Sequence, residues 1–341
     1  MKKYSIAVVG ATGAVGETLL ELLVERKFPV DKVYPLASQR SVGKTVELGH
    51  QSLAVENLDA FDFSKVDIAF FSAGGDISHD YVPKAAEAGA IVIDNTSRFR
   101  YENDIPLVVP EVNPEAIKNY KVRNIIANPN CSTIQMVVAL KPLYDAVGIE
   151  RINVATYQAV SGTGKQALEE LAHQTASLLN AKPVETKVYP KQIAFNVLPH
   201  IDRLEDNGYT FEEMKMVRET QKIFADDQIK VNPTAVRVPV FYGHAEAVNI
   251  ETKEKITATK ALELLENAPG VKVIDGVGES FDYPTPVSDA SGKDAVYVGR
   301  IREDISCDKG INLWVVADNV RKGAALNAIQ IAEHLIKNEL P

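Results

Sequence analysis

The first third of the chain alternates short apolar runs with longer amphipathic ones, which is the pattern of a doubly wound α/β sheet. Tyr4–Val9 is a short apolar run, Val15–Arg26 has helical periodicity, and Val33–Ala37 returns to a strand pattern. These three segments predict a compact βαβ unit. Further strands are expected at 68–71, 91–94 and 125–127, and helical stretches at 78–88 and 114–120. We therefore expect a parallel, Rossmann-type sheet in this part of the chain.

From about Arg151 the pattern changes to longer strands with many β-branched and aromatic residues. The candidate strands are 152–159, 235–240, 245–250 and 312–317. Such a succession predicts a mixed α+β domain. The final run, Gly323–Asn338, is an amphipathic helix of the kind that covers an α/β sheet, so we expect it to return to the first domain.

The predicted division follows from these two patterns. A nucleotide-binding domain is expected at 1–129 and 322–341, and a mixed α+β domain at 130–321.

Composition narrows the class of protein. The 341 residues are 45% hydrophobic and 24% charged, which is typical of a globular protein with room for two cores. The net charge is −9, with no basic block, so nucleic-acid binding is not expected. No apolar run is long enough to cross a bilayer, and the N-terminus enters a strand pattern rather than a signal peptide. The expected location is therefore the cytoplasm.

The chain has only two cysteines, Cys131 and Cys307. They fit a reducing compartment and show no metal-ligand spacing, so no metal is expected. Cys131 begins the segment Asn130-Cys131-Ser132-Thr133, directly before the apolar helical run 134–143. A helix N-terminus carries unpaired N–H groups and partial positive charge, which favour a thiolate and could hold an oxyanion. An inert buried cysteine is the commoner alternative, but the other motifs favour a nucleophile.

A glycine-rich turn joins the first predicted strand to the first helix. Small residues there allow a pyrophosphate to approach the backbone and the helix N-terminus. The spacing GxxGxxG differs from the usual GxGxxG, but the flanking strand and helix support a dinucleotide site. A second glycine-rich turn, with Ser72 and Gly74, follows another strand and is a weaker candidate. The first turn reads Gly10-Ala11-Thr12-Gly13-Ala14-Val15-Gly16.

The end of the second strand favours NADP over NAD. An NAD enzyme would carry Asp or Glu there for the ribose hydroxyls, whereas this chain has Ser38, Arg40 and Ser41. A guanidinium and two hydroxyls suit a 2′-phosphate. The nearest acid, Asp31, precedes the predicted strand. A merely solvated Arg40 is the alternative.

In the second half, Gln158 ends a strand and precedes Ser161-Gly162-Thr163-Gly164-Lys165. This turn could approach a nicotinamide ring, but it lacks the spacing of a Walker motif. The amide of Gln158 could orient a carboxylate or carbonyl without titrating. His244 lies beside the turn at Gly243, where a histidine is suited to proton transfer but is often only structural.

An anionic substrate would need basic residues, and Arg100, Lys222 and Arg237 are the candidates, although each could face solvent. Arg100 closes the polar segment that begins where the strand 91–94 stops, the usual rim of a crevice. Glu219 and Lys222 are three residues apart on a helical stretch and so share a face, which a surface ion pair would also explain.

Taken in order, these motifs resemble the aspartate-semialdehyde dehydrogenase family over nearly the whole chain. The resemblance implies that Cys131 accepts the acyl group, that His244 is the acid/base, and that Gln158 and Arg237 orient the substrate. It further implies that Glu219 pairs with the substrate amine. The phosphate binders would be Arg100 and Lys222, with Asn130 facing the phosphate. The implied cofactor positions are Thr12, Gly13, Ala14, Val15, Arg40, Ser41, Ser161, Gly162 and Asn319.

The resemblance also implies a reaction: NADPH-dependent reduction of L-4-aspartyl phosphate to L-aspartate 4-semialdehyde with release of phosphate. That step leads to threonine and methionine, and through diaminopimelate to lysine. The resemblance further implies a homodimer or homotetramer, with 130–321 as the catalytic and dimerisation domain and 1–129 with 322–341 as the NADP-binding domain. The alternatives are another acyl-phosphate reductase, such as N-acetyl-glutamyl-phosphate reductase or a phosphorylating glyceraldehyde-3-phosphate dehydrogenase, and a non-catalytic NADP sensor. The role of residues 173–216 stays open.

Overall fold

The computed structural model describes residues 2–276, 278 and 281–340. The chain divides into two compact units. Unit 1 comprises Met1–Asn130 and Ala324–Pro341, and unit 2 comprises Cys131–Gly323. None of the helices in the described ranges is long and apolar enough to cross a membrane.

Unit 1 is built on a six-stranded sheet in which every paired strand runs parallel to its neighbour. The central strands are apolar on both faces because helices cover both sides of such a sheet. The predicted parallel, Rossmann-type sheet is therefore confirmed. In spatial order the strands are β5 (Glu56–Asn57), β2 (Val30–Ala37), β1 (Tyr4–Val9), β6 (Ile68–Phe71), β7 (Ile91–Asp94) and β8 (Ile125–Ala127).

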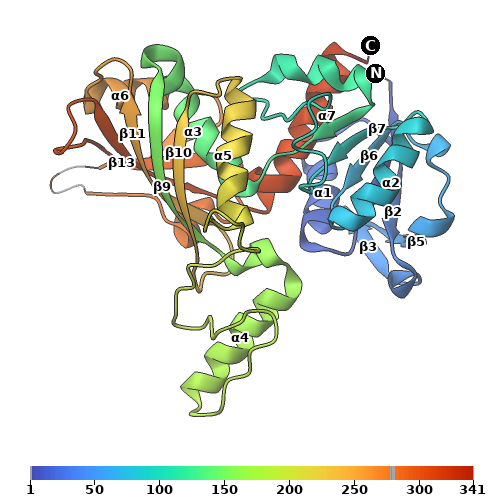
Figure 1. Cartoon of the computed structure of the whole chain (residues 1–341). Coiled ribbons are helices and arrows are strands. Elements are labelled where there is room, and N and C mark those ends of the chain that lie inside the picture. Colours follow the sequence, from blue (N-terminus) through green and yellow to red (C-terminus); the bar gives the residue numbers. More distant parts are fainter. Residues whose placement is uncertain (1, 277, 279–280, 341) are drawn as a thin grey trace. The chain divides into compact units, whose positions relative to one another are not determined.

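Helices and short turns pack around this sheet (Figure 1). The C-terminal helix α7 (Leu326–Asn338) lies against α1 and β7, as the sequence predicts. The Arg26 guanidinium binds the Glu333 carboxylate of α7 at 2.7 and 2.8 Å. The other elements of unit 1 are α1 (Ala14–Glu25), α2 (Gly75–Glu87), the hairpin β3 (Thr45–Leu48) and β4 (Gln51–Ala54), and the 3₁₀ turns η1 (Gln39–Ser41), η2 (Leu58–Ala60), η3 (Phe63–Lys65) and η4 (Pro114–Val122).

Unit 2 holds a six-stranded sheet of mixed strand direction, packed with helices, which confirms the mixed α+β domain predicted for the second half of the chain. The pairs β9–β10 and β12–β13 are parallel, and the other pairs are antiparallel. In spatial order the strands are β10 (Lys230–Arg237), β9 (Ile149–Gln158), β11 (His244–Thr252), β14 (Gly310–Ala317), β13 (Val296–Glu303) and β12 (Val271–Val273).

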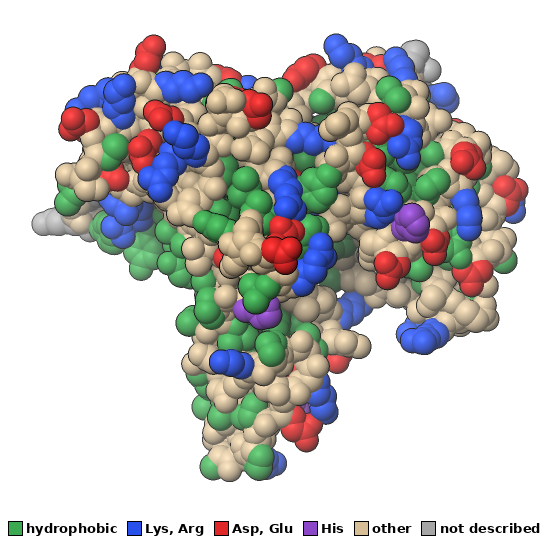
Figure 2. All heavy atoms as spheres, viewed as in Figure 1, with side chains coloured by type: hydrophobic (Ala, Val, Ile, Leu, Met, Phe, Trp, Pro, Cys, Tyr) green, Lys and Arg blue, Asp and Glu red, His purple; other side chains and the backbone are tan. Residues whose placement is uncertain are grey.

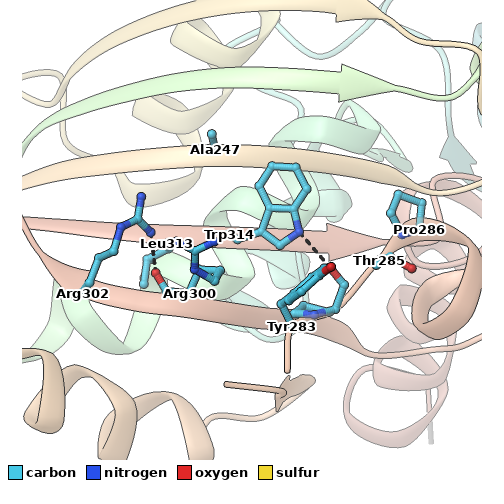
Figure 3. A pocket seen from close by; sticks show the side chains of 9 residues that line it. Ala247, Tyr283, Thr285, Pro286, Arg300, Arg302, Leu313 and Trp314 are labelled. Carbon is cyan, nitrogen blue, oxygen red and sulfur yellow. Dashed lines mark hydrogen bonds between the residues drawn. The ribbon is translucent and has the colours of Figure 1, made fainter. Parts of the chain in front are cut away.

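The helices α3 (Cys131–Val147), α5 (Phe211–Phe224) and α6 (Ala258–Glu266) pack on the sheet of unit 2. On β11 the residues in phase with His244 are buried, whereas Ala247 and Asn249 are only half-buried. Ala247 lines a groove on the opposite face of the sheet, with a cavity volume of about 320 Å³ (Figure 3). The Trp314 indole N–H donates to the carbonyl of Pro284 at one side of this groove.

Residues 173–216 carry no sequence motif. Most of them belong to an arm of unit 2, defined here as residues 165–210, which begins with α4 (Lys165–Leu179) and ends where α5 starts. Helix α4 stands away from the sheet in Figure 1. The Glu170 carboxylate accepts hydrogen bonds from three successive backbone N–H groups, those of Lys187, Val188 and Tyr189. Figure 2 shows apolar side chains on the surface of this arm together with a few acidic and basic ones.

Several predicted boundaries need correction. The strand expected at 235–240 ends at Arg237, because Pro239 cannot donate to a strand ladder. The stretch 114–120 is a 3₁₀ helix rather than an α-helix. The final helix begins at Leu326, after the π-turn η8 (Arg321–Ala325). Asp31 lies inside β2 and not before it, although at the end of the strand remote from Ser38.

Candidate active site

Helix α3 begins at Cys131, the first residue of unit 2. Its residues from 132 to 140 are all buried, because the helix packs on the sheet and against α5 and α6. Cys131 is half-buried and is not part of a disulfide. The thiol therefore sits at a buried helix N-terminus, where backbone N–H groups and the helix dipole favour a thiolate.

The backbone of Gly323 lies directly against this cysteine. A Cβ at Gly323 would be 2.7 Å from the Cβ of Cys131. The turn that holds Gly323 in place is organised by Asp318, whose carboxylate accepts from the N–H groups of Val320 and Arg321 at 2.9 and 2.8 Å. The Gly323 N–H donates to the Asp318 carbonyl at 2.9 Å. This position can hold only glycine without displacing Cys131.

Two turns of unit 2 are joined through the side chain of Asn319. The Gly243 N–H donates to Asn319 Oδ1 at 2.9 Å, and Asn319 Nδ2 donates to Ser161 Oγ at 2.9 Å. Ser161 belongs to the 3₁₀ turn η5 (Val160–Thr163). The predicted residues Ser161, Gly162 and Asn319 are thus close to the turn before His244.

His244 is the first residue of β11 and is fully buried. Its Nδ1 accepts a hydrogen bond from the Ala159 N–H at 3.0 Å. A Cβ added to Gly162 would lie 3.5 Å from His244 Nε2 and 3.2 Å from Arg237 Nη1. Burial, and then the nearby Arg237 guanidinium, lower the pKa of His244 to about 3. The ring is therefore neutral near pH 7 in this structure.

The Arg237 and Gln158 side chains flank this histidine. Arg237 Nη1 donates to the Ala159 carbonyl at 2.7 Å, and its Nε has no hydrogen-bond partner among the described residues. Gln158 Nε2 donates to Thr156 Oγ1 and to Glu212 Oε1, both at 3.2 Å. An amide held in this way has a fixed orientation without carrying charge.

Glu219 and Lys222 lie on α5, as the helical spacing predicts. Glu219 is fully buried, whereas Lys222 is half-buried. The helix begins with a capping box: Thr210 accepts from the Glu213 N–H, and Glu213 accepts from the Thr210 N–H at 2.7 Å. Glu213 also accepts from the Ala235 N–H of β10 at 2.9 Å, which fixes the start of α5 against the sheet.

In unit 1 the glycine-rich turn has the geometry of a phosphate-binding turn. Gly10 has φ +88, which favours glycine, and a Cβ at Gly16 would be 2.2 Å from the Gly10 carbonyl oxygen. Gly13 occupies the N-cap of α1 without a side-chain cap. Thr12, Ala14 and Val15 complete this turn and the first residues of the helix. Bare backbone N–H groups at a helix N-terminus fit the pyrophosphate of a dinucleotide.

The other predicted cofactor residues of unit 1 lie at the carboxyl ends of neighbouring strands. Gly10 and Ser72 are in contact: a Cβ at Gly10 would be 3.0 Å from Ser72. Gly74 has φ +99 and is the N-cap of α2. Ser38 precedes η1 at the end of β2, and Arg40 is exposed on that turn with Ser41 beside it. The Arg40 guanidinium and the hydroxyls of Ser38 and Ser41 are the kinds of donor that suit a 2′-phosphate of NADP.

Arg100 is buried in unit 1, with its side chain fixed by backbone carbonyls. Its Nε donates to Asn128 O at 2.9 Å and its Nη2 to Asn95 O at 2.7 Å. Asn130 is buried two residues after Asn128. The neighbouring carboxyl of Asp94 has a pKa raised by burial.

Some buried polar residues near these sites were missed by sequence reasoning. Glu246 is in phase with Val248 and Ile250, so the strand alternation could have identified it as inward-facing. Gln135 and Lys322 gave no comparable signal. Among the described residues no group of three or more acidic, histidine or cysteine side chains could hold a metal.

Two family models match the chain. The model described as "Semialdehyde dehydrogenase, NAD binding domain" matches residues 5–120, and that described as "Semialdehyde dehydrogenase, dimerisation domain" matches residues 140–322. The fold and these matches define a semialdehyde dehydrogenase with a Rossmann-type NAD(P)-binding domain.

Individual relatives narrow this class. Aspartate-semialdehyde dehydrogenase 2 of Vibrio cholerae is 63% identical over 337 residues, which are 99% of either chain. The solved structure of Vibrio cholerae aspartate semialdehyde dehydrogenase II complexed with ASA has a TM-score of 0.97 at 62% identity, and covers 99% of this chain and 100% of that one. The Candida albicans enzyme with NADP has a TM-score of 0.78 at 27% identity, with full coverage of both chains. This chain belongs to the aspartate-semialdehyde dehydrogenase family.

Proposed function

We propose that this enzyme reduces L-4-aspartyl phosphate to L-aspartate 4-semialdehyde with NADPH, releases phosphate, and works through a thioester on Cys131. The observation that carries the proposal is the placement of Cys131 at the N-terminus of α3 in a chain 63% identical to a named aspartate-semialdehyde dehydrogenase. The proposed pathway is the synthesis of threonine, methionine and, through diaminopimelate, lysine.

In the first half of the reaction the Cys131 thiolate attacks the acyl carbon of the aspartyl phosphate. A C–S bond forms, the carbonyl oxygen becomes an oxyanion, and N–H groups at the start of α3 stabilise it. Collapse of the oxyanion breaks the C–O bond to phosphate and leaves the thioester. We assign phosphate binding to Arg100 and Lys222, with Asn130 facing the phosphate.

NADPH, when bound, supplies the hydride that reduces the thioester. The residues proposed to hold it are the turn Gly10–Gly16, then Ser38, Arg40, Ser41, Ser72 and Gly74 in unit 1, and Ser161, Gly162 and Asn319 in unit 2. A serine in place of Cys131 would give an ester, which is less reactive toward hydride than a thioester.

His244 is the proposed acid/base. Because its Nδ1 accepts from Ala159, the proton of the neutral ring is on Nε2, so the ring can donate to the oxyanion of the reduced thioester. Collapse of that oxyanion restores the C=O bond, breaks the C–S bond and returns the thiolate. The overall reaction takes up one proton, which ends on the released phosphate. An anionic substrate beside His244 would raise its pKa and let the ring carry this proton.

Substrate choice is assigned to three residues. Gln158 and Arg237 are rigidly held and orient the α-carboxylate, while Glu219 pairs with the free amine. An acetylated amine or a hydroxyl would not need an acid there, so the Glu219→Ala variant should lose the aspartyl substrate selectively. Equal losses for all acyl phosphates would contradict this role and favour another acyl-phosphate reductase.

We further propose that the enzyme is a cytoplasmic homodimer or homotetramer. The family model for residues 140–322 is described as a dimerisation domain, and the groove beside Trp314 in Figure 3 leaves an apolar face on the sheet of unit 2. Tyr157 packs on Trp314 on this face and is 38% exposed. A second copy of the chain is the proposed occupant.

To test the reaction, the formation of NADPH from aspartate semialdehyde, NADP and phosphate is monitored through the absorbance of the reduced nicotinamide. We expect phosphate-dependent turnover that is lost in Cys131→Ser and kept in the control Cys307→Ser. Turnover that survives in Cys131→Ser would contradict the thioester. A wild-type protein without turnover would direct the search to other acyl phosphates, and failure with those would favour the NADP sensor.

A further inference from the structure

Glu246 is a carboxyl without an assigned task, fully buried two residues after His244. In the part of the chain that the structure describes, neither of its carboxyl oxygens makes a hydrogen bond of ordinary geometry. Its neighbours in register are Thr156 on β9 and Val315 on β14. Burial raises its pKa well above the usual range, and the Gln135 side chain lowers it in part. Burial therefore favours the protonated, uncharged form of this carboxyl.

The Gln135 side chain, on helix α3, is close enough to Glu246 to lower the pKa of that carboxyl. It is fully buried, and neither atom of its amide makes a hydrogen bond of ordinary geometry with a described residue. A carboxylic acid and a primary amide are complementary, because each offers one donor and one acceptor. The acid O–H can donate to the amide oxygen while the amide N–H donates to the acid carbonyl. A small side-chain adjustment would thus satisfy both groups at once.

The spacing of the two elements relates this pair to the proposed catalytic pair. Gln135 is four residues from Cys131, about 6 Å along a helix and on the same face. Glu246 is two residues from His244, about 7 Å along a strand and on the same face. The distance from Cys131 to Gln135 along α3 is thus nearly equal to the distance from His244 to Glu246 along β11. Since α3 packs on β11, the two pairs can face each other in the same order.

A separate set of contacts places Cys131 at the His244 end of this arrangement. His244 pairs with Ala317 on β14. The next residue, Asp318, accepts a hydrogen bond from the Gly323 N–H, and Gly323 lies against Cys131. Cys131 and His244 therefore lie at one end of the contact between α3 and β11. Gln135 and Glu246 lie about 6–7 Å further along the same two elements.

We propose that Gln135 and Glu246 form a neutral positioning pair that fixes the start of α3 against β11 and so holds Cys131 at its working distance from His244. The pair acts through its neighbours and touches no reacting atom. This inference rests on the proposed roles of Cys131 and His244. It assigns to Glu246 a task that a glutamine can perform and that a leucine cannot.

The test compares Glu246→Gln, Glu246→Leu, Gln135→Leu and the double leucine variant. Small misplacements at a reacting centre mainly affect the chemical step, so we expect Glu246→Leu to lower kcat about tenfold with KM changed less than about twofold. Glu246→Gln should keep kcat within about twofold of the wild type. The double variant should be no worse than either single one, because the two side chains act as a unit. The control is Thr252→Val at the other end of β11, where the hydroxyl is within hydrogen-bond distance of the carbonyls of Glu254 and Lys309.

A second readout needs no turnover. The pH dependence of Cys131 alkylation by iodoacetamide gives the midpoint of its thiol titration. We expect the same midpoint in Glu246→Gln and the wild type, and a higher one in Glu246→Leu and Gln135→Leu. Infrared absorption of a protonated carboxyl should be present in the wild type and reduced in Glu246→Gln.

Three results would overturn the proposal. A lower alkylation midpoint in Glu246→Gln would mean that the wild-type group is ionised. Wild-type kcat in Glu246→Leu, with a loss of stability like that of Thr252→Val, would mean that the pair only fills space. If the loss of kcat in the double variant equals the sum of the losses in the single variants, expressed as free energies, the two residues act independently and do not form a pair. If the wild type does not turn over aspartate semialdehyde, the proposed function fails, while alkylation and infrared absorption still decide on the pair.

Discussion

His244 accepts a hydrogen bond at Nδ1 from the backbone N–H of Ala159, 3.0 Å away. A backbone N–H can only donate, so Nδ1 must be the unprotonated nitrogen and the ring proton must be on Nε2. The strand that begins with His244 and the strand end that precedes Ala159 are adjacent in the sheet of unit 2. The tautomer of the proposed acid/base is thus set by the backbone.

The first prediction concerns the titration of this ring. In the folded state the pKa of His244 is about 3, against 6.5 for an ordinary histidine. Between these values the unfolded chain binds more protons, so the contribution to stability is complete above pH 6.5 and is lost as the pH falls toward 3. We expect His244→Gln to remove this part of the acid sensitivity in urea unfolding. Nitrogen NMR of the ligand-free protein should show the Nε2–H tautomer near neutral pH, and a ring that titrates near 6.5 would contradict the prediction.

The second prediction concerns Gly323. A methyl group there would lie 2.7 Å from the Cβ of Cys131, so Gly323→Ala should cost about 1–3 kcal/mol and lower kcat by at least about tenfold. The matched control is Gly310→Ala, where the added Cβ would be 2.5 Å from the Cβ of Asp304. We expect the control to lose stability but to keep its kcat. Equal kcat values for both variants would show that Cys131 tolerates displacement.

The third prediction concerns cofactor choice. Arg40 is exposed at the end of β2 and is proposed to bind the 2′-phosphate. Arg40→Ala should weaken NADPH binding by about tenfold or more and leave NADH binding within about twofold, as measured by titration of nicotinamide fluorescence. Lys44→Ala, which removes another exposed positive charge four residues away, is the control for general electrostatics. Equal losses for both cofactors would rule out this role of Arg40.

The fourth prediction concerns the start of α5. Glu213 completes the capping box with Thr210 and also binds the Ala235 N–H of β10. Removing it leaves two buried N–H groups without a partner, so Glu213→Ala should cost about 2–4 kcal/mol. Thr257→Ala, which removes the simpler N-cap of α6, should cost about 1 kcal/mol. Urea unfolding, monitored by circular dichroism, measures the loss of unfolding free energy in each variant. Similar losses in Glu213→Ala and Thr257→Ala would mean that the hydrogen bond to β10 does not contribute to stability.

Much of the parallel sheet could be predicted because its strands are apolar runs bounded by turn residues. The expected bounds of β1, β6, β7 and β8 agree with the structure residue by residue. The structure of the arm, residues 165–210, could not be predicted, because Glu170 accepts hydrogen bonds from backbone groups seventeen to nineteen residues away and no local pattern encodes this. Tertiary contacts of this kind override local signals.

The candidate site was also only partly accessible from sequence. The pattern of the sequence placed Cys131 shortly before the helical run 134–143, and His244 beside the turn at Gly243, directly before the strand expected at 245–250. The link between them through Ala317, Asp318 and Gly323 depends on strand pairing and a turn, which the sequence does not specify. Glu246 was missed because an isolated glutamate in a strand is usually taken as solvent-facing, although its phase with Val248 indicates the opposite.

The chain passes between its units at only two peptide bonds, Asn130–Cys131 and Gly323–Ala324, and the contact of Gly323 with Cys131 brings the two ends of unit 2 to one point. Unit 2 is therefore an insertion within unit 1. Unit 1 needs α7, whose residues pack on α1 and β7, and α7 follows unit 2 along the chain. During synthesis, unit 2 is thus the first unit whose sequence is complete, although unit 1 is begun before it.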